Sequence, residues 1–180
     1  MRVYLVRHGQ DDPSVRGGWS NQPLTPEGHK QAETLAERIL TDKISVERVY
    51  SSDLPRAMQT ADPIAKALGL TVIPTPQFRE VNNGDLAGMD NTLALEKYPG
   101  LFWNTLAWEQ HYPNGESPRE FYGRIKAAWA ELVESKEENI LLVTHSGVIH
   151  VILSILSGSD YSNRAVHPKI THAELITIEL

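Results

Sequence analysis

The sequence predicts an α/β fold: a three-layer sandwich with a mostly parallel central sheet and helices on both faces. Strand-like and helix-like segments alternate along the 180 residues. The two clearest strands are continuous apolar runs, which is typical of parallel strands buried on both faces. No repeat, low-complexity tract or linker interrupts the alternation, so we expect a single domain over residues 1–180.

The first predicted element is a strand at residues 2–7, a run of mainly aliphatic side chains. A helix follows at residues 26–40, where apolar side chains recur at helical spacing. Thr25 is placed to cap this helix, and Pro26 occupies its first position, where an absent N–H costs no hydrogen bond. Residues 48–52 are a weaker strand candidate.

A second helix is expected from about residue 54 to residue 68, with small and aliphatic side chains on one face. Gly69 follows it directly and can take the left-handed conformation that closes many helices. Residues 71–75 are another weak strand candidate. These elements continue the alternation that defines the predicted fold.

The last third of the chain predicts two more helices and two strands. Ser117 and Glu120 form the capping-box pattern that begins a helix. Residues 139–144 are the second clear strand, and residues 148–156 predict a buried helix because they are apolar on almost every side. Residues 173–180 alternate apolar and polar side chains, as a final strand would.

Composition limits the classes of partner. The chain has 17 Lys and Arg against 23 Asp and Glu, a net charge of −6, which argues against nucleic acid or an anionic membrane as the main partner. Absence of cysteine excludes disulfides, thiolate catalysis and Cys-ligated zinc. The apolar run at residues 3–6 is too short for a signal peptide, and no stretch approaches membrane-spanning length. We therefore expect a cytoplasmic protein; nothing indicates its oligomeric state.

Both clear strands end on a histidine that small residues follow. His8 precedes Gly9, and His145 precedes Ser146 and Gly147. Ligands of open α/β sheets bind at the carboxyl ends of the strands, where the following helices begin. If the two strands are neighbours, the imidazoles face each other across one pocket.

Two arginines could reach the same pocket. Arg7 precedes His8, and Arg56 lies at the start of the second helix, where a cation is unfavourable unless an anion or acid is near. Guanidinium groups and helix N-termini together favour a phosphate or a carboxylate. Taken singly, Arg56 could instead pair with Asp53, Arg7 with a surface carboxylate, and His145 could be structural. Their joint occurrence at strand ends favours a site.

The segments LVRHG, VYSSDLPRAMQTA, FREVNNGDLAG, NGES and LLVTHSGVI resemble, in order and spacing, the histidine phosphatase superfamily, the phosphoglycerate-mutase-like proteins. The segment RGGWSNQPLTPEGHKQA extends the resemblance to nearly the whole chain. The resemblance implies that His8 is the covalent nucleophile and that Glu80 protonates the leaving group. It also implies that the phosphoryl group is bound by Arg7, Arg56 and His145.

The chemistry of these residue types fits a metal-independent phosphatase acting on a small phosphorylated metabolite. A neutral imidazole, with an ordinary pKa of about 6.5, is a usable nucleophile. Arginines can stabilise the charge on the equatorial phosphoryl oxygens, as Mg²⁺ does elsewhere, so no metal or cofactor is expected. A carboxyl with a raised pKa can protonate the departing alkoxide, and water then hydrolyses the phosphohistidine.

Asp11 and Ser14 depart from the family pattern, which usually has Thr or Ser and then Asn at these places. Asp11 could face the substrate, where its charge would repel a phosphate or accept a hydrogen bond from a substrate hydroxyl or amine. It could instead orient Arg7 or Arg16. It could also be a solvated aspartate in the turn before Pro13.

The remaining features bear on specificity. Mutases that resemble this sequence are generally longer, which favours hydrolysis over a phosphoglycerate-type mutase activity. The aromatic-rich residues 98–113 are expected to cover the pocket, where they contact an apolar part of the substrate or simply pack a cap onto the sheet. Four other histidines are interpreted as structural or solvent-facing: His29, His150, His167 and His172.

Two hypotheses from other classes stay open. A metal-dependent hydrolase could use His8, His145 and Glu80, but adjacent arginines would repel the cation and no typical ligand spacing supports it. A non-catalytic, phosphate-binding regulatory module would keep the pocket without turnover. Hydrolysis of a generic phosphomonoester separates this module from an enzyme.

Overall fold

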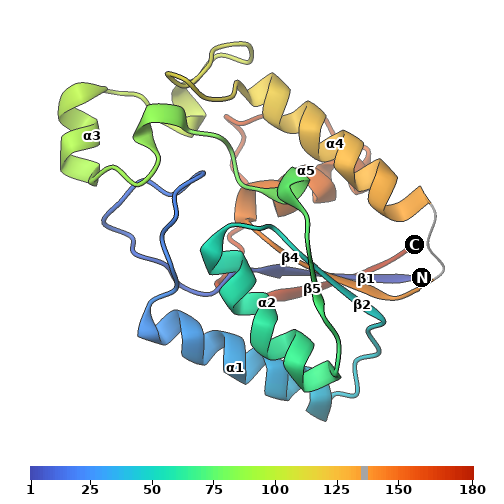
Figure 1. Ribbon diagram of the computed structural model, residues 1–180. Coiled ribbons are helices and arrows are strands. Elements are labelled where there is room, and N and C mark those ends of the chain that lie inside the picture. Colours follow the sequence, from blue (N-terminus) through green and yellow to red (C-terminus); the bar gives the residue numbers. More distant parts are fainter. Residues whose placement is uncertain (135–137) are drawn as a thin grey trace.

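The computed structural model describes residues 1–134 and 138–180 (Figure 1). Within this part of the chain, five strands form one sheet in the order β3-β2-β4-β1-β5. Strand β5 is antiparallel to β1, and the other pairs are parallel. The strands are β1 (Arg2–Arg7), β2 (Arg48–Ser51), β3 (Val72–Pro74), β4 (Ile140–Thr144) and β5 (Leu175–Glu179). The predicted, mostly parallel sheet is confirmed.

Helices cover both faces of the sheet, as the sequence predicts. Figure 1 shows α1 and α2 on one face and α4 and α5 on the other. The helices are α1 (Pro26–Thr41), α2 (Pro55–Leu68), α3 (Asn91–Lys97), α4 (Pro118–Glu134) and α5 (Ser146–Ser157). In the described part of the chain, three short 3₁₀ turns lie between β3 and α4: η1 (Pro76–Phe78), η2 (Gly84–Leu86) and η3 (Trp103–Thr105). The molecule is therefore a three-layer sandwich.

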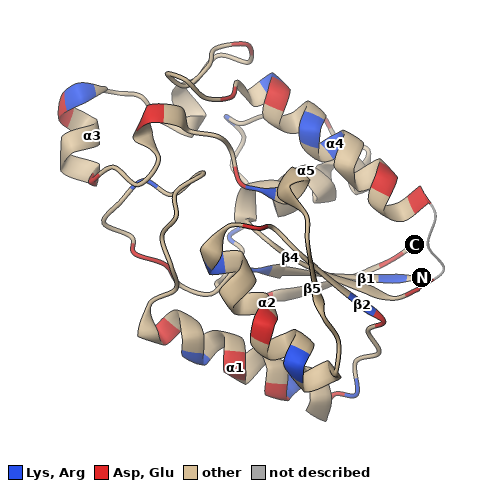
Figure 2. Cartoon of the chain, in the orientation of Figure 1, with Lys and Arg blue, Asp and Glu red and all other residues tan. Residues whose placement is uncertain are grey.

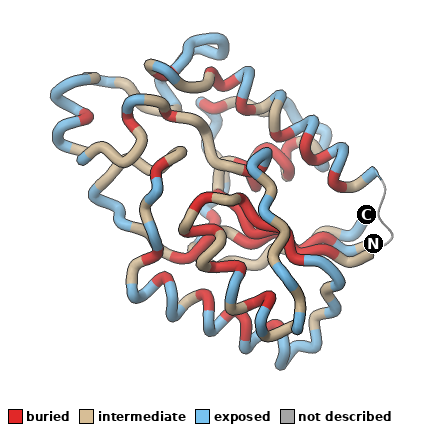
Figure 3. The backbone as a smooth tube through the Cα atoms, viewed as in Figure 1, coloured by how far each residue is buried: buried red, intermediate tan, exposed pale blue. Residues whose placement is uncertain are grey.

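Alternate side chains of each central strand supply the two apolar layers. Tyr4 and Val6 of β1 pack among residues of α1 and α2, whereas Val3 and Leu5 pack among residues of α4 and α5. Strand β4 is buried at every position, which explains its continuous apolar sequence. Figure 3 shows buried residues concentrated in the strands and on the inner faces of the helices.

The predicted helix caps are present. The Thr25 side chain accepts a hydrogen bond from the Gly28 N–H at 3.1 Å. Gly69 closes α2 with a φ of 68°. At the start of α4, the Ser117 N–H donates to Oε2 of Glu120 and the Glu120 N–H donates to Oγ of Ser117, so the capping box is complete.

Strands β1 and β4 are direct neighbours, and their register places the site. Arg7 lies opposite Thr144, and the His8 N–H donates to the Thr144 carbonyl at 2.9 Å. His8 and His145 therefore follow the carboxyl ends of two neighbouring central strands and lie side by side there. Both chain ends lie at the opposite end of these strands (Figure 1).

The segment at residues 98–113 packs as a cap with its own small core. Leu106 and Tyr112 are buried against Leu86, and Trp103 packs edge-on against Phe121 of α4 at a ring-centroid distance of 5.3 Å. Acidic and basic side chains are interspersed on α1, α3 and α4 (Figure 2). Among the described residues, no helix is both long and apolar enough to cross a membrane.

Candidate active site

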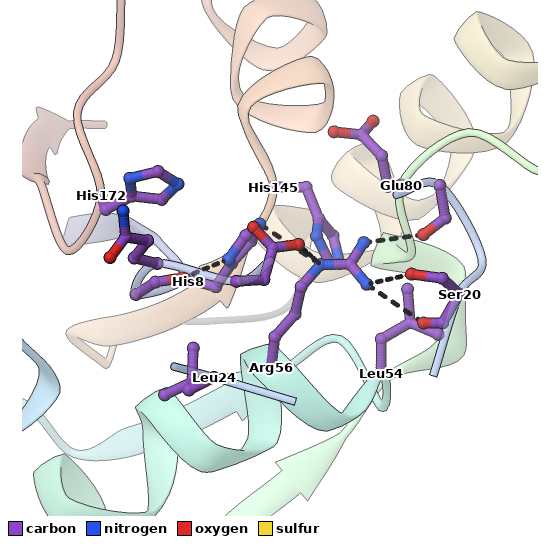
Figure 4. A network of polar contacts seen from close by, with 12 residues as sticks. His8, Ser20, Leu24, Leu54, Arg56, Glu80, His145 and His172 are labelled. Carbon is purple, nitrogen blue, oxygen red and sulfur yellow. Dashed lines mark hydrogen bonds and ion pairs between the residues drawn. The ribbon is translucent and has the colours of Figure 1, made fainter. Parts of the chain in front are cut away.

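His8 and His145 meet at the carboxyl ends of β1 and β4. Their ring centroids are 5.1 Å apart, and both residues are buried. Figure 4 shows them at the centre of the site, with His172 and Glu80 toward opposite sides of the view. The sequence-based expectation that neighbouring strands bring the two imidazoles together is confirmed.

The contacts of His8 define its protonation. Nδ1 lies 2.7 Å from the Gly9 carbonyl oxygen, which can only accept, so Nδ1 carries the proton. Burial, and then the charge of Arg56, hold the pKa of His8 well below its ordinary value of 6.5. The Nε–H of Arg56 donates to Nε2 of His8 at 3.4 Å. His8 is therefore a neutral imidazole whose Nε2 lone pair faces Arg56.

The turn after His8 requires glycine. A Cβ atom on Gly9 would lie 2.5 Å from the Gly28 carbonyl oxygen, because the start of α1 passes directly against this turn. The Gly9 N–H donates to the Thr60 hydroxyl at 2.9 Å, and that hydroxyl donates to the Arg56 carbonyl at 2.7 Å. The backbone around His8 is thereby attached to α2.

Arg56 is 1% exposed, and besides His8 it contacts three further residues. Its Nη2 donates to the Gly18 carbonyl at 2.7 Å, and its Nη1 donates to the Ser20 carbonyl at 3.1 Å (Figure 4). Its Nε lies 3.5 Å from Oδ2 of Asp11. The alternative in which Arg56 pairs with Asp53 is wrong.

Asp53 is instead bound by Arg79, whose Nε and Nη2 donate to its two carboxylate oxygens at 2.6 and 2.5 Å. Asp53 begins the turn into α2, and Arg79 follows η1 at the edge of the sheet, where the fork of the guanidinium matches the carboxylate. The charge of Asp53 is therefore balanced outside the pocket, which leaves Arg56 free to point into it.

Asp11 lies in the pocket, but it contacts Arg56 rather than Arg7 or Arg16. Its side chain is 19% exposed, so the interpretation as a solvated turn residue is wrong. A β-bridge between Asp11 and Leu24 fixes this loop against the start of α1 and directs the carboxylate inward. Ser14 is exposed, and its N–H donates to Asp12.

Arg7 is held by residues of the segment before β5. Its Nη1 donates to the Ile170 carbonyl, and its Nη2 lies 2.9 Å from Nε2 of His172. Because arginine only donates, Nε2 of His172 accepts, and His172 is neutral. Burial and the charge of Arg7 both lower the pKa of His172. Arg7 does not use a surface carboxylate as its hydrogen-bond partner.

His172 is the residue that sequence reasoning missed. Its ring centroid is 5.8 Å from that of His8, and it lines the same pocket, so the expectation that it has no place in a site is wrong. It lies in an irregular segment before β5, where no periodicity positions a side chain. The available signal was topological, because the residues before an antiparallel neighbour of β1 lie at the carboxyl end of β1.

Glu80 enters the site from the segment between η1 and η2. Its Oε2 accepts from the Gly147 N–H and its Oε1 from the Val81 N–H, both at 3.1 Å. A Cβ atom on Gly147 would lie 2.4 Å from Oε1, so only glycine at this position admits the carboxyl group. Burial raises the pKa of Glu80, and the two backbone hydrogen bonds oppose that rise.

The pocket above His8 is a hollow of about 290 Å³. Its walls include Arg7, His8, Arg56, Glu80 and His172. His145 is fully buried behind this wall, with Nε2 2.8 Å from the Ser52 hydroxyl. The buried Nε of Arg7 and Nδ1 of His145 have no hydrogen-bond partner among the described residues. Buried polar nitrogens normally have partners, and the Nε–H of Arg7, which lines the pocket, could donate to an acceptor oxygen of a ligand.

Stability should fall in mild acid because His8 and His145 are buried and neutral. Their folded-state pKa values lie well below 6.5, and those of His150 and His172 are also lowered. The unfolded chain binds these protons below about pH 6.5, so this stability is present above pH 6.5 and is lost as the pH falls. The raised pKa of Glu80 acts in the opposite direction. We expect the free energy of unfolding to drop by roughly 1–3 kcal/mol from about pH 7.5 to 5.5.

Urea denaturation at the two pH values measures this change. His145→Gln should weaken the pH dependence of the free energy of unfolding, because the variant lacks one of the buried imidazoles that must stay neutral in the folded protein. His29→Gln is the matched control, since His29 is exposed on α1, and it should leave the dependence unchanged. Equal or greater stability at the lower pH would contradict neutral histidines in the folded protein.

Fold and pocket together define an α/β protein with a donor-rich site for a phosphate-sized anion at the carboxyl edge of its sheet. Residues 3–180 match the sequence model of the histidine phosphatase superfamily (branch 1). The chain belongs to this superfamily. Among the described residues, no group of three or more His, Asp or Glu side chains is placed to hold a metal ion.

The similar proteins include phosphatases and a phosphoglycerate-mutase-like protein. A Hydrogenobacter thermophilus protein provisionally named phosphoserine phosphatase 2 is 33% identical, with 90% of this chain and 81% of the relative aligned. An Enterobacter protein named as a probable phosphoglycerate mutase, GpmB, is 34% identical over 88% of this chain and 75% of its own. The structure of a mycobacterial glucosyl-3-phosphoglycerate phosphatase superposes with a TM-score of 0.82 at 27% identity, covering 99% of this chain and 89% of its own.

Proposed function

We propose that this protein is a cytoplasmic, metal-independent phosphomonoester hydrolase that acts on a small phosphorylated metabolite through a phosphohistidine on His8. The observation that carries the proposal is the state of His8. Its proton is held on Nδ1 by the Gly9 carbonyl, and its Nε2 lone pair faces a pocket walled by two guanidinium groups. Attack on a phosphate ester requires a neutral nucleophile and positively charged groups around the phosphoryl oxygens.

In the first step, Nε2 of His8 forms a bond to phosphorus while the bond from phosphorus to the alcohol oxygen breaks. Arg7 and Arg56 stabilise the charge on the equatorial oxygens. Arg56 must turn its Nε–H from Nε2 of His8 toward these oxygens. We expect this movement to bring the phosphoryl group within reach of Nδ1 of His145, which has no partner among the described residues. A proton on that nitrogen requires the Ser52 hydroxyl to donate to Nε2 of His145.

Glu80 supplies the proton that the departing alkoxide needs. Because its pKa is raised, Glu80 is protonated to a greater extent at a given pH than an exposed glutamate. Its carboxyl group lies on the pocket wall. In the second step, the Glu80 carboxylate takes a proton from water, whose oxygen bonds to phosphorus as the phosphorus–nitrogen bond breaks. Inorganic phosphate leaves, and both His8 and Glu80 return to their starting states.

Turnover of p-nitrophenyl phosphate in the presence of a chelator tests the proposed function. We expect release of inorganic phosphate at an unchanged rate, because Arg7 and Arg56 would repel a divalent cation. No turnover would favour the non-catalytic binding module, and loss of turnover on chelation would favour a metal-dependent hydrolase. A mutase would be detected with a phosphomonoester that carries a second hydroxyl, from which it would return the isomeric phosphomonoester without releasing phosphate.

Glu80→Gln is expected to slow the hydrolysis of alkyl phosphates far more than that of p-nitrophenyl phosphate. An alkoxide needs protonation as it leaves, whereas nitrophenolate departs unaided, so the gap in kcat/KM should widen by roughly 10²-fold or more. Steady-state kinetics on both substrates measures it. Glu33→Gln, at an exposed position of α1, is the control. Equal losses on both substrates would reassign Glu80 to positioning.

A further inference from the structure

A second cavity, of about 380 Å³, opens beside the catalytic pocket. The two hollows share Glu80 and Ser146, so they meet at the carboxyl group that we assign as proton donor. We call the second hollow the leaving-group cavity. Its other walls are Val81, Trp103, Gly147, His150, Tyr161 and His167.

Planar rings form much of the wall of the leaving-group cavity. His167 stacks between two rings, with its centroid 4.7 Å from that of His150 and 5.5 Å from that of Tyr161. Burial raises the pKa of Tyr161 and lowers that of His150, so both are neutral at physiological pH. Arginine and aspartate are absent from its described lining, in contrast to the catalytic pocket, and Glu80 is the acidic residue that the two hollows share.

The order of groups along the reaction axis decides what this cavity holds. A phosphoryl group bound between His8 and Arg56 must direct its leaving oxygen toward Glu80, because Glu80 protonates it. The rest of the alcohol then lies beyond Glu80, where the leaving-group cavity begins. Polar, densely hydroxylated alcohols gain little from such walls, whereas planar rings stack on aromatic side chains and bury apolar area.

We propose that the leaving-group cavity binds the alcohol part of the substrate, and that this part carries an apolar group with a planar ring. The inference rests on the proposed hydrolase function and names its substrate class. The cap at residues 98–113 contributes through Trp103, and the segment after α5 contributes Tyr161 and His167.

Two phosphomonoesters with alkyl leaving groups of similar acidity test the proposal: 2-phenylethyl phosphate and 2-hydroxyethyl phosphate. We expect kcat/KM to be about tenfold or more higher for the phenylethyl ester, because only its ring fills the cavity. Calorimetric binding of the corresponding phosphonates, which cannot be hydrolysed, should show the same preference in Kd. Equal values for both members of each pair, or a preference for the hydroxyethyl compounds, would overturn the proposal.

His150→Asp locates the preference in this cavity. The variant places a carboxylate among the aromatic walls and should reduce the phenylethyl preference, measured as the ratio of the kcat/KM values of the two esters, at least about fivefold. His29→Asp makes the same charge change on α1, across the sheet, and should keep the preference. Equal effects of the two variants would overturn the location. If His150→Asp does not fold, Tyr161→Ala serves as the second variant and should reduce the phenylethyl preference. A Tyr161→Ala variant that keeps the full preference would overturn the proposed location.

Failure of the cavity proposal and failure of the hydrolase function give different results. Turnover of both esters at similar rates would overturn the cavity proposal and leave the hydrolase intact. If neither ester is hydrolysed while phenylethylphosphonate still binds at least tenfold more tightly than hydroxyethylphosphonate, the cavity proposal is supported and the hydrolase function is overturned.

Discussion

His8→Gln should abolish turnover, with a loss in kcat of roughly 10⁴-fold or more, because it removes the Nε2 atom that we assign as the nucleophile. Glutamine keeps the size of the side chain and can hydrogen-bond to its surroundings, so the fold should persist. Arg7 and Arg56 are unchanged, and inorganic phosphate should still bind within a few-fold of its normal affinity. Phosphate release and calorimetric phosphate binding measure the two effects separately.

His172→Gln is the matched comparison for His8→Gln. It removes the other imidazole on the pocket wall but leaves the nucleophile, and glutamine can still accept the hydrogen bond from Arg7. A loss of no more than about tenfold is expected, because only the positioning of Arg7 is disturbed. If the two variants lost activity equally, or if His8→Gln kept more than about a hundredth of its turnover, His8 would not be the nucleophile.

Arg56→Met should lower kcat/KM by roughly 10³-fold, because it removes a buried donor aimed at the transferring phosphoryl group. The same change leaves the Gly18 and Ser20 carbonyls without their donor and Asp11 without its ion pair. We expect a loss of about 2–4 kcal/mol in the free energy of unfolding, measured with urea. Arg56→Lys should recover part of the stability but little activity, since the three N–H donors of an ammonium group lie on one atom and lack the planar spread of the guanidinium nitrogens.

Asp11→Asn, made alone and together with Arg56→Met, shows whether Asp11 acts through Arg56. The 3.5 Å contact places Asp11 as an orienting group for the guanidinium. Asp11→Asn should therefore reduce activity in the normal protein and have almost no effect once Arg56 is gone. Asp11→Asn that raised activity on simple phosphomonoesters would instead show that its charge opposes phosphate binding. Equal effects in both backgrounds would mean that Asp11 acts independently of Arg56.

The layers of the fold were predictable because burial determines the pattern of the long elements. Strand β4 is apolar at every position before Thr144. A capping threonine and a proline mark the N-terminus of α1 in the sequence. Helix α3 has seven residues and the 3₁₀ turns have three each, which is too short for any periodicity to show. Helix α5 begins at Ser146, two residues earlier than the apolar pattern indicates, because its first turn carries Ser146 and Gly147.

The site was predictable where strand ends determine position and not where loops do. His8, His145 and Arg7 follow from the parallel pairing of β1 with β4. The partner of Asp11 and the place of His172 depend on the paths of two irregular segments, which tertiary packing fixes. A motif in the sequence can thus indicate the nucleophile. The residues that orient the arginines cannot be identified in this way, because tertiary packing decides where they lie.

Rapid acid-free quenching of the reaction with a phosphoryl-labelled monoester tests the central claim most directly. We expect one labelled phosphoryl group per chain on the peptide that contains His8, formed faster than steady-state phosphate release. The adduct should be stable in base, labile in acid, and absent from His8→Gln. Label on any other residue, or full turnover with no adduct under conditions that trap phosphohistidine, would contradict the covalent mechanism.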